Sequence, residues 1–162
     1  MNLQRKQLHM ADKAPNTLPW PPLIFGGLVI AGLLLQRALP IEVPATLAWP
    51  GYGMLAAGIV MDIWAMATMA RARTNILPHR AADRLVTTGP FAHMRNPIYV
   101  GNTIATAGLG LALQNGWLLI ATPAAALATH HLAVVREQAH LQEKFGQAWS
   151  AYASRVKAWW IV

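Results

Sequence analysis

The chain has 162 residues, of which 55% are hydrophobic and only 12% are charged, against about 25% charged residues in soluble domains. Its formal net charge is +7, and it has no cysteine, which excludes disulfides, thiolate metal sites and cysteine nucleophiles. The apolar residues come in blocks of roughly twenty, the length that crosses a hydrocarbon layer. We therefore expect an all-α integral membrane protein, with a retained arm at 1–19 and a single membrane-embedded domain at 20–162.

The first two apolar blocks predict membrane-spanning helices at 20–39 and 46–70. Pro21 and Pro22 lie where the first helix would begin, a position at which the missing N–H costs little. Pro40 follows directly after the expected end of that helix, and proline cannot continue a helix. A short connection therefore joins two antiparallel spans.

Two further spans are predicted at 97–113 and 117–135. The pair Asn115-Gly116 between them is a tight-turn signal. The long connection at 71–96, which precedes the third span, is rich in arginine. Its arginines are Arg71, Arg73, Arg80, Arg84 and Arg95.

The cations predict the orientation of the chain in the cell membrane. They gather in the arm, in the loop at 71–96 and in the C-terminal tail, whereas the two short connections hold none. The positive-inside rule therefore places both termini and the long loop in the cytoplasm, beside anionic lipid headgroups. Nucleic acid is not an expected partner, because no basic helix carries interleaved stacking aromatics.

A last amphipathic stretch at 141–156 follows the fourth span. Its apolar residues recur at steps of three or four, which makes one helical face. This pattern predicts one C-terminal helix that lies on the membrane surface or covers the long loop. The apolar positions are Leu141, Phe145, Trp149, Tyr152 and Val156.

Arg95-Asn96-Pro97 is a candidate anion site at the start of the third span. Asn is a favoured N-cap and Pro suits the first helical position, so the helix should begin sharply here. Its positive end would face the cytoplasm and favour a carboxylate, to which Arg95 can add a bidentate pair. Gly101, one turn on, permits close approach of a ligand or a helix. The alternative is a capped span with an interfacial arginine.

Four segments in this order resemble the isoprenylcysteine carboxyl methyltransferase family, its bacterial relatives and, more broadly, the phospholipid methyltransferases. The resemblance covers about residues 69–156, and the ordered set with its spacings is what makes it specific. The segments are Thr74-Asn75-Ile76-Leu77-Pro78, Leu85-Val86-Thr87-Thr88-Gly89-Pro90-Phe91, Arg95-Asn96-Pro97-Ile98-Tyr99-Val100-Gly101, and Glu137…Leu141…Phe145-Gly146…Tyr152…Val156.

The resemblance implies a membrane enzyme that binds S-adenosylmethionine at the cytoplasmic face. It would transfer the methyl group to a lipophilic or lipid-anchored acceptor: an isoprenylcysteine-like carboxylate, or a lipid amine or thiol. By similarity, Arg95, Asn96 and Glu137 are the expected catalytic residues. Arg95 suits the carboxylate of the cofactor, and Glu137 suits its ammonium. The expected cofactor-binding residues are Gly89, Pro90, Arg95, Asn96, Pro97, Tyr99, Gly101 and Glu137.

This chain departs from the family pattern at two positions. Asn96 replaces the histidine of a common Arg-His-Pro, and it cannot titrate near neutral pH. Gln138 replaces the second of two glutamates, which removes one negative charge. If the acceptor is an amine or a thiol, a base is useful, and His93 and His140 are the candidates.

Two other functions remain open from the sequence. One is an NADPH-dependent membrane reductase with a sterol-reductase-like core, in which Arg71, Arg73 and Arg80 hold a phosphate. The other is a non-catalytic scaffold or transporter, in which the intramembrane acid Asp62 is the important residue. No metal site is expected, because the adjacent pair His130-His131 would point in different directions on a helix.

Overall fold

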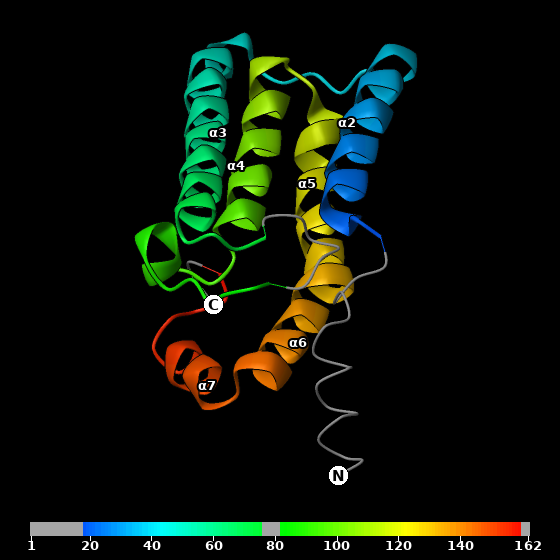
Figure 1. The fold of residues 1–162 in the computed structure, drawn as a ribbon. Helices are drawn as coiled ribbons and strands as arrows, with labels where there is room; N and C mark the ends of the chain where they lie inside the picture. The colour runs from blue at the N-terminus through cyan, green and yellow to red at the C-terminus, as the bar shows by residue number, and fades with distance from the viewer. Residues whose placement is uncertain (1–17, 76–81, 160–162) are drawn as a thin grey trace.

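The computed structural model describes residues 18–75 and 82–159, and every regular element in these ranges is a helix. The expected all-α fold is therefore confirmed for this part of the chain, whereas most of the predicted arm at 1–19 lies outside it. Figure 1 shows α3, α4, α5 and α2 side by side in this order, with α6 and α7 beyond one end. The helices are α2 (Trp20–Ala38), α3 (Ala48–Arg71), α4 (Pro97–Ala112), α5 (Gly116–Thr129), the π-helical turn η3 (His130–Val134), α6 (Val135–Phe145) and α7 (Gln147–Ala153), with 3-10 turns η1 (Ala45–Leu47) and η2 (Gly89–Ala92).

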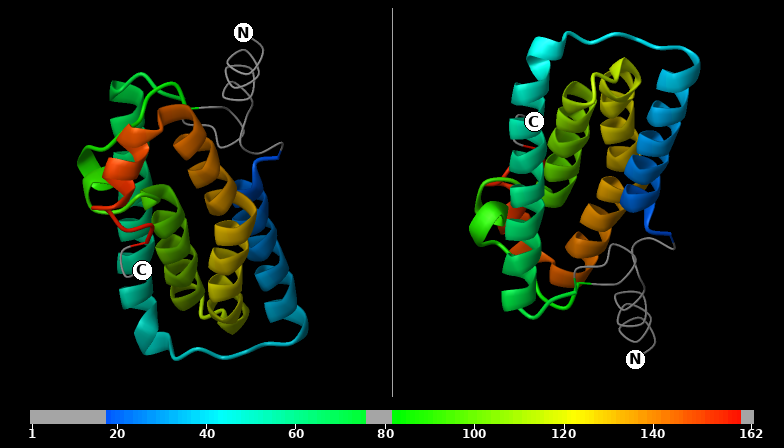
Figure 2. Two further views of the ribbon diagram at one scale, coloured as in Figure 1. Left: turned by 90° about the horizontal axis from the view of Figure 1, so that it is seen from below. Right: turned by 90° about the horizontal axis from the view of Figure 1, so that it is seen from above.

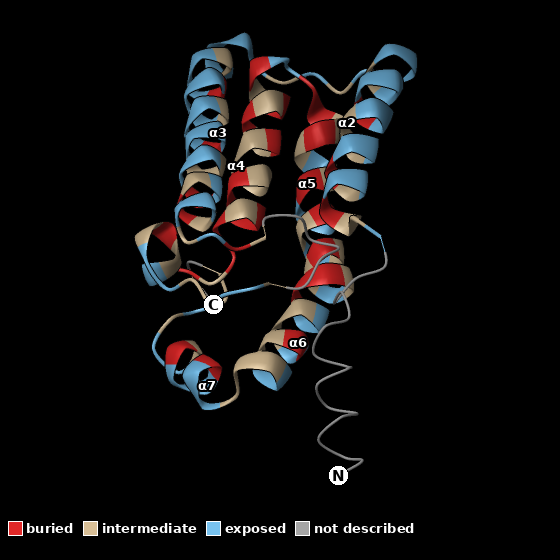
Figure 3. Cartoon of the chain, viewed as in Figure 1, coloured by how far each residue is buried: buried red, intermediate tan, exposed pale blue. Residues whose placement is uncertain are grey.

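Three stretches of helix are long and apolar enough to cross a membrane: Trp20–Ala38, Ala45–Arg71 and Gly116–Phe145. The outer faces of α2 and α3 are largely exposed, as Figure 3 shows, and Trp49 on α3 is 83% exposed. Exposed apolar faces of this kind suit contact with lipid. The remaining predicted span, at 97–113, corresponds to α4, which has 16 residues and packs against α3 and α5.

Glycines bring α3 and α4 into close contact along their length. A methyl group added at Gly58 of α3 would lie 2.5 Å from the backbone nitrogen of Ala105 on α4, and one added at Gly101 would overlap the Asp62 carboxylate. Small residues at such positions let helix backbones approach closely in membranes. This contact fixes the start of α4 beside the last turns of α3, where the candidate site lies.

Asn115 closes the opposite end of the bundle. Its side-chain oxygen accepts a hydrogen bond from the Leu118 N–H at 3.1 Å, and its side-chain amide donates to the Gly32 carbonyl at 2.9 Å. Nearby, the Gln36 amide donates to the Ile41 carbonyl at 3.1 Å. The predicted turn at 115–116 is thus a capped helix start that also holds α2.

The C-terminal part differs from the expectation in two ways. The helix does not end at residue 135, because α5 continues through η3 into α6 and stops only at Phe145. The single amphipathic helix expected at 141–156 is wrong: Gly146 adopts φ +51°, the left-handed region that favours glycine, and it separates α6 from α7. The chain therefore turns back, and Trp149 and Tyr152 of α7 become buried.

Candidate functional site

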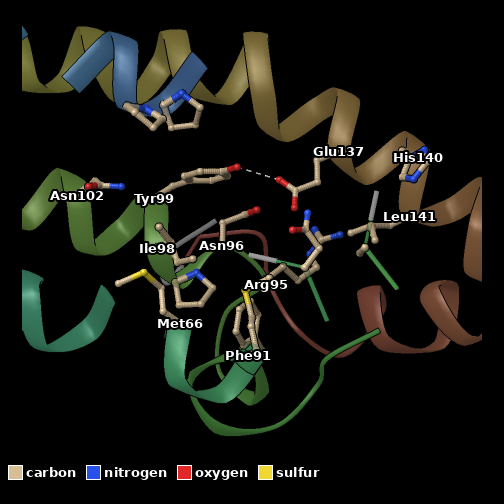
Figure 4. Close-up of a pocket in the computed structure, with 16 residues that line it drawn as sticks. Met66, Phe91, Arg95, Asn96, Ile98, Tyr99, Asn102, Glu137, His140 and Leu141 are labelled. Atoms are coloured by element: carbon tan, nitrogen blue, oxygen red, sulfur yellow. Dashed lines mark hydrogen bonds between the residues drawn. The ribbon is translucent and has the colours of Figure 1, made fainter. Parts of the chain in front are cut away.

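A cavity of about 260 Å³ lies where the first turns of α2 and α4, the last turns of α3 and the start of α6 meet (Figure 4). Its volume is close to the lower end of the range for small-molecule pockets, about 300–1,000 Å³. The lining residues are Pro21, Pro22, Met66, Met69, Asn75, Ala82, Phe91, Arg95, Asn96, Pro97, Ile98, Tyr99, Asn102, Glu137, His140 and Leu141.

Glu137 is held on the cavity wall by Tyr99. The Tyr99 hydroxyl donates to Oε2 of Glu137 at 2.9 Å, from the first turn of α4 to the first turn of α6. Tyr99 is only 8% exposed, so water competes little for this bond. A carboxylate fixed in a mostly apolar cavity is a strong partner for a ligand cation, because charge interactions are weakly screened there.

Arg95 lies on the same cavity, in the loop between η2 and α4. Its guanidinium carbon is 5.6 Å from the centre of the Trp149 ring, a cation–π arrangement. Its Nε is buried and makes no hydrogen bond within the described part of the chain. A buried N–H donor without a partner costs free energy, so this guanidinium is suited to a bound anion.

The segment at 152–159, which we call the tail strap, fastens the loop that carries Arg95. The Tyr152 hydroxyl donates to the Phe91 carbonyl at 2.6 Å, and the Lys157 carbonyl accepts from the Arg95 N–H at 2.9 Å. Figure 2, seen from below, shows the red C-terminal segment against the green loop before α4. Burial raises the pKa of Tyr152 to about 12, so this hydroxyl keeps its proton at neutral pH.

The start of α4 is at Pro97, as predicted, with Asn96 in the N-cap position. The predicted side-chain cap is wrong, however, because the Asn96 side chain makes no cap hydrogen bond. Its amide donates instead to the Ala158 carbonyl of the tail strap at 2.8 Å. Asn96 thus joins the cavity wall to the strap, a role that the local sequence does not show.

The expected cofactor residues divide into two groups. The cavity lining includes Arg95, Asn96, Pro97, Tyr99 and Glu137. The three others lie elsewhere: Gly89 (φ +60°) packs against Thr68, Pro90 is fully buried, and Gly101 faces Asp62. The two glycines permit close packing and the Pro90 ring fixes the backbone. These three residues therefore shape the backbone around the cavity and do not form its surface.

Several lining residues were not singled out from the sequence. Pro21 and Pro22 come from α2 and Met66 from α3, and only the packing of the helices brings them together. Asn102 did leave a signal, because it is three residues after Tyr99 and therefore on the same face of α4.

The histidines have different surroundings. His140 is 8% exposed and lines the cavity, and its Nε2 has no hydrogen-bond partner in the described residues; His93 is exposed. The His130 Nδ1 accepts a hydrogen bond from the Trp159 indole at 3.1 Å.

Within residues 18–75 and 82–159, no group of three or more His, Cys, Asp or Glu side chains could hold a metal ion.

A second, smaller cavity of about 50 Å³ lies on the other side of Arg95 and Glu137. The two cavities share both of these charged residues, and Trp149 lines the smaller one.

The phosphate site expected for a reductase is only partly described. Arg71 and Arg73 are exposed and line neither cavity. Arg80 lies outside the described residues.

Comparison with known proteins gives two matches. The family model described as phospholipid methyltransferase matches residues 46–148, which is more than half of the chain. The chain is also 36% identical over 94 residues to the nickel-cobalt-cadmium resistance protein NccN of Alcaligenes xylosoxydans xylosoxydans. That match includes 57% of this chain but only 44% of the relative, so the chain spans less than half of the relative's length.

Proposed function

The chain belongs to the phospholipid methyltransferase family, and on that premise we propose that it transfers the methyl group of S-adenosylmethionine to a lipophilic acceptor. The family and the three apolar helices support methyl transfer at a membrane. The cofactor, the acceptor and the roles of individual residues are the proposal.

One observation carries the proposal: Arg95 and Glu137 lie on the walls of one cavity. The methionine end of the cofactor carries a carboxylate and an ammonium group. The Nε of Arg95, which has no hydrogen-bond partner among the described residues, suits the carboxylate. The carboxylate of Glu137 suits the ammonium. The side chains present therefore fit both charges of the cofactor.

The cofactor, when bound, supplies an electrophilic methyl group on a positively charged sulfur. The residues of the chain hold the reactants in place and exclude water. Trp149 orients the Arg95 guanidinium, and Tyr99 orients Glu137. Fixing a donor and an acceptor in line lowers the entropic part of the barrier, and a dry cavity favours a step in which the sulfonium charge is lost.

We place the site at the cytoplasmic face of the cell membrane, with the acceptor entering from the bilayer. Support comes from the arginine-rich loop at 71–96 beside the site and from the positive-inside rule. Arg71 and Arg73 are exposed and outside the cavities, so no observation favours the reductase. The acceptor class stays as expected above: an isoprenylcysteine-like carboxylate, or a lipid amine or thiol.

Calorimetric titration of the purified protein with S-adenosylhomocysteine tests cofactor binding directly. We expect saturable binding in nanodiscs, and its absence in both nanodiscs and a mild detergent would reject the proposal. Transfer of a labelled methyl group into a total lipid extract, followed by identification of the product, would then name the acceptor. A twofold excess of NADPH should not displace the bound S-adenosylhomocysteine.

A further inference from the structure

The main cavity has a charged end and an apolar end. Arg95, Glu137 and His140 line the first, whereas Met66 and Ile98 line the second (Figure 4). Pro21 and Pro22 of α2 also line the cavity. The side-chain amide of Asn102 on α4 also lines the cavity, on the side away from Arg95 (Figure 4). In ligand pockets, a polar group in an apolar wall fixes the orientation of the ligand.

The Asn102 amide is available for such a contact. It is half-buried, and its side chain has no hydrogen-bond partner among residues 18–75 and 82–159. Its backbone carbonyl accepts a hydrogen bond from the Thr106 hydroxyl at 2.8 Å, which leaves the side-chain amide uninvolved. A side-chain amide can both donate and accept hydrogen bonds, so the Asn102 amide can bind a polar ligand group in the cavity.

Asn102 also lies deeper in the helical bundle than the charged residues. It is three residues after Tyr99 along α4, which corresponds to about 4.5 Å of helix rise. Asn102 therefore lies beyond the Tyr99–Glu137 pair, on the side away from the long loop.

The walls around Asn102 belong to helices that have different packing partners. α2 packs mainly against α5, and α3 packs mainly against α4. Pro22 of α2 and Met66 of α3 both line the cavity and are both exposed. The cavity is thus bounded by two helices whose outer faces are apolar and would contact lipid tails.

We propose that Asn102 determines acceptor specificity by hydrogen-bonding the polar head of an amphiphile whose apolar chain leaves the cavity between α2 and α3. This rests on the proposed function for the identity of the reaction. The lining residues at this end carry no formal charge, and the cofactor uses Arg95 and Glu137. The head group at Asn102 is therefore uncharged, because an ion there would have no counter-charge from the protein. Among the acceptors named above, this favours the thiol or the neutral amine over the carboxylate.

A cysteine reporter tests the contact without the cofactor, because the natural chain has no cysteine. Ile98→Cys places a thiol one turn from Asn102 on the same face of α4. In nanodiscs, dodecan-1-ol should slow labelling by N-ethylmaleimide at about 2- to 13-fold lower concentration than dodecane, the effect of one neutral hydrogen bond. Adding Asn102→Leu should abolish this difference between the two probes.

The same difference between the probes in both backgrounds, or none in either, would overturn the assignment. Met66→Cys, on α3, is a second reporter for the case in which Ile98→Cys does not fold. Thr106→Val is the matched control, because Thr106 lies one turn beyond Asn102 and is buried outside the cavity. It should leave the difference between the probes unchanged.

A kinetic arm separates this inference from the proposed function. Asn102→Leu should raise the amount of total lipid extract needed for half-maximal methyl transfer, again about 2- to 13-fold, with an unchanged affinity for S-adenosylhomocysteine. Equal half-maximal amounts would overturn the role of Asn102 alone. Loss of S-adenosylhomocysteine binding in the natural chain, with the probe difference retained, would overturn the methyltransferase proposal and leave the Asn102 contact standing.

Discussion

The two ends of the helical bundle differ in how completely their buried polar side chains are hydrogen-bonded. At the end near Asn115, the side chains of Asn115, Gln36 and Trp117 all donate hydrogen bonds to backbone carbonyls. At the other end, Arg95 Nε and His140 Nε2 are buried without a partner in the described residues. Buried polar groups in native proteins normally have partners. Because Arg95 and His140 both line the cavity, their unpaired nitrogens are available to a ligand there.

The largest expected effect comes from removing the Asn115 hydrogen bonds at the fully hydrogen-bonded end of the bundle. Asn115→Ala removes a helix cap and leaves the Gly32 carbonyl without its donor. We expect the free energy of unfolding to fall by about 2–4 kcal/mol, measured by denaturant titration in detergent micelles. The affinity of the folded protein for S-adenosylhomocysteine should not change. A weaker affinity at unchanged stability would contradict the division between the two ends.

The next effect concerns the cavity end, where Arg95 and Glu137 lie. We expect substitutions there to weaken ligand binding with little effect on the free energy of unfolding. Arg95→Ala and Glu137→Ala should each weaken S-adenosylhomocysteine binding by about 1.5–3 kcal/mol, the scale of a charged hydrogen bond. Gln138→Ala is the control, because Gln138 follows Glu137 but does not line the cavity. Calorimetry gives all three values, and unchanged affinity in both site variants would remove the site assignment.

A smaller effect is expected for Trp149, which orients Arg95. Trp149→Leu removes the ring and should weaken S-adenosylhomocysteine binding by about 0.5–2 kcal/mol, the range for a cation–π contact. Trp149→Phe keeps an aromatic face and should lose less. If the two variants bind equally, Trp149 contributes through packing alone.

The smallest effect is expected for the bond between Tyr152 and the Phe91 carbonyl. Tyr152→Phe should lower the free energy of unfolding by about 0.5–1.5 kcal/mol. The pKa of Tyr152 is raised from 10.0 to about 12, so the fold favours the protonated form. Its contribution is therefore complete below pH 10 and is lost as the pH rises through 12. Unfolding curves between pH 9 and 12 should show this loss in the natural chain and a smaller one in the variant.

Local sequence signals predicted the parts of the fold that depend on helix length and helix starts. The first span, the start of α4 at Pro97 and the return near Asn115 follow from apolar length and from proline and asparagine positions. The break at Gly146 was missed, because the apolar spacing continues across it and only the backbone angle reveals the turn. Periodicity alone cannot distinguish one amphipathic helix from two.

The candidate site was predictable only in part, for a related reason. Arg95 and Tyr99 belong to one short segment, whereas Glu137 reaches them because α5, η3 and α6 form one continuous helical run. The prolines of α2 join the cavity through tertiary packing, which leaves no trace in the local sequence. The bond from Asn96 to Ala158 joins positions 62 residues apart, so propensity favoured a cap that the structure does not form.

The tail strap has a consequence for the order in which the protein matures. Tyr152 follows its partner Phe91 by 61 residues, which is roughly 3–12 s of synthesis at about 5–20 residues per second. The Arg95 loop therefore leaves the ribosome well before the residues that fasten it. Insertion of the apolar helices into the bilayer and assembly of the pocket are thus separate events in time, and a chain stalled before residue 152 would be membrane-inserted but without a finished binding site.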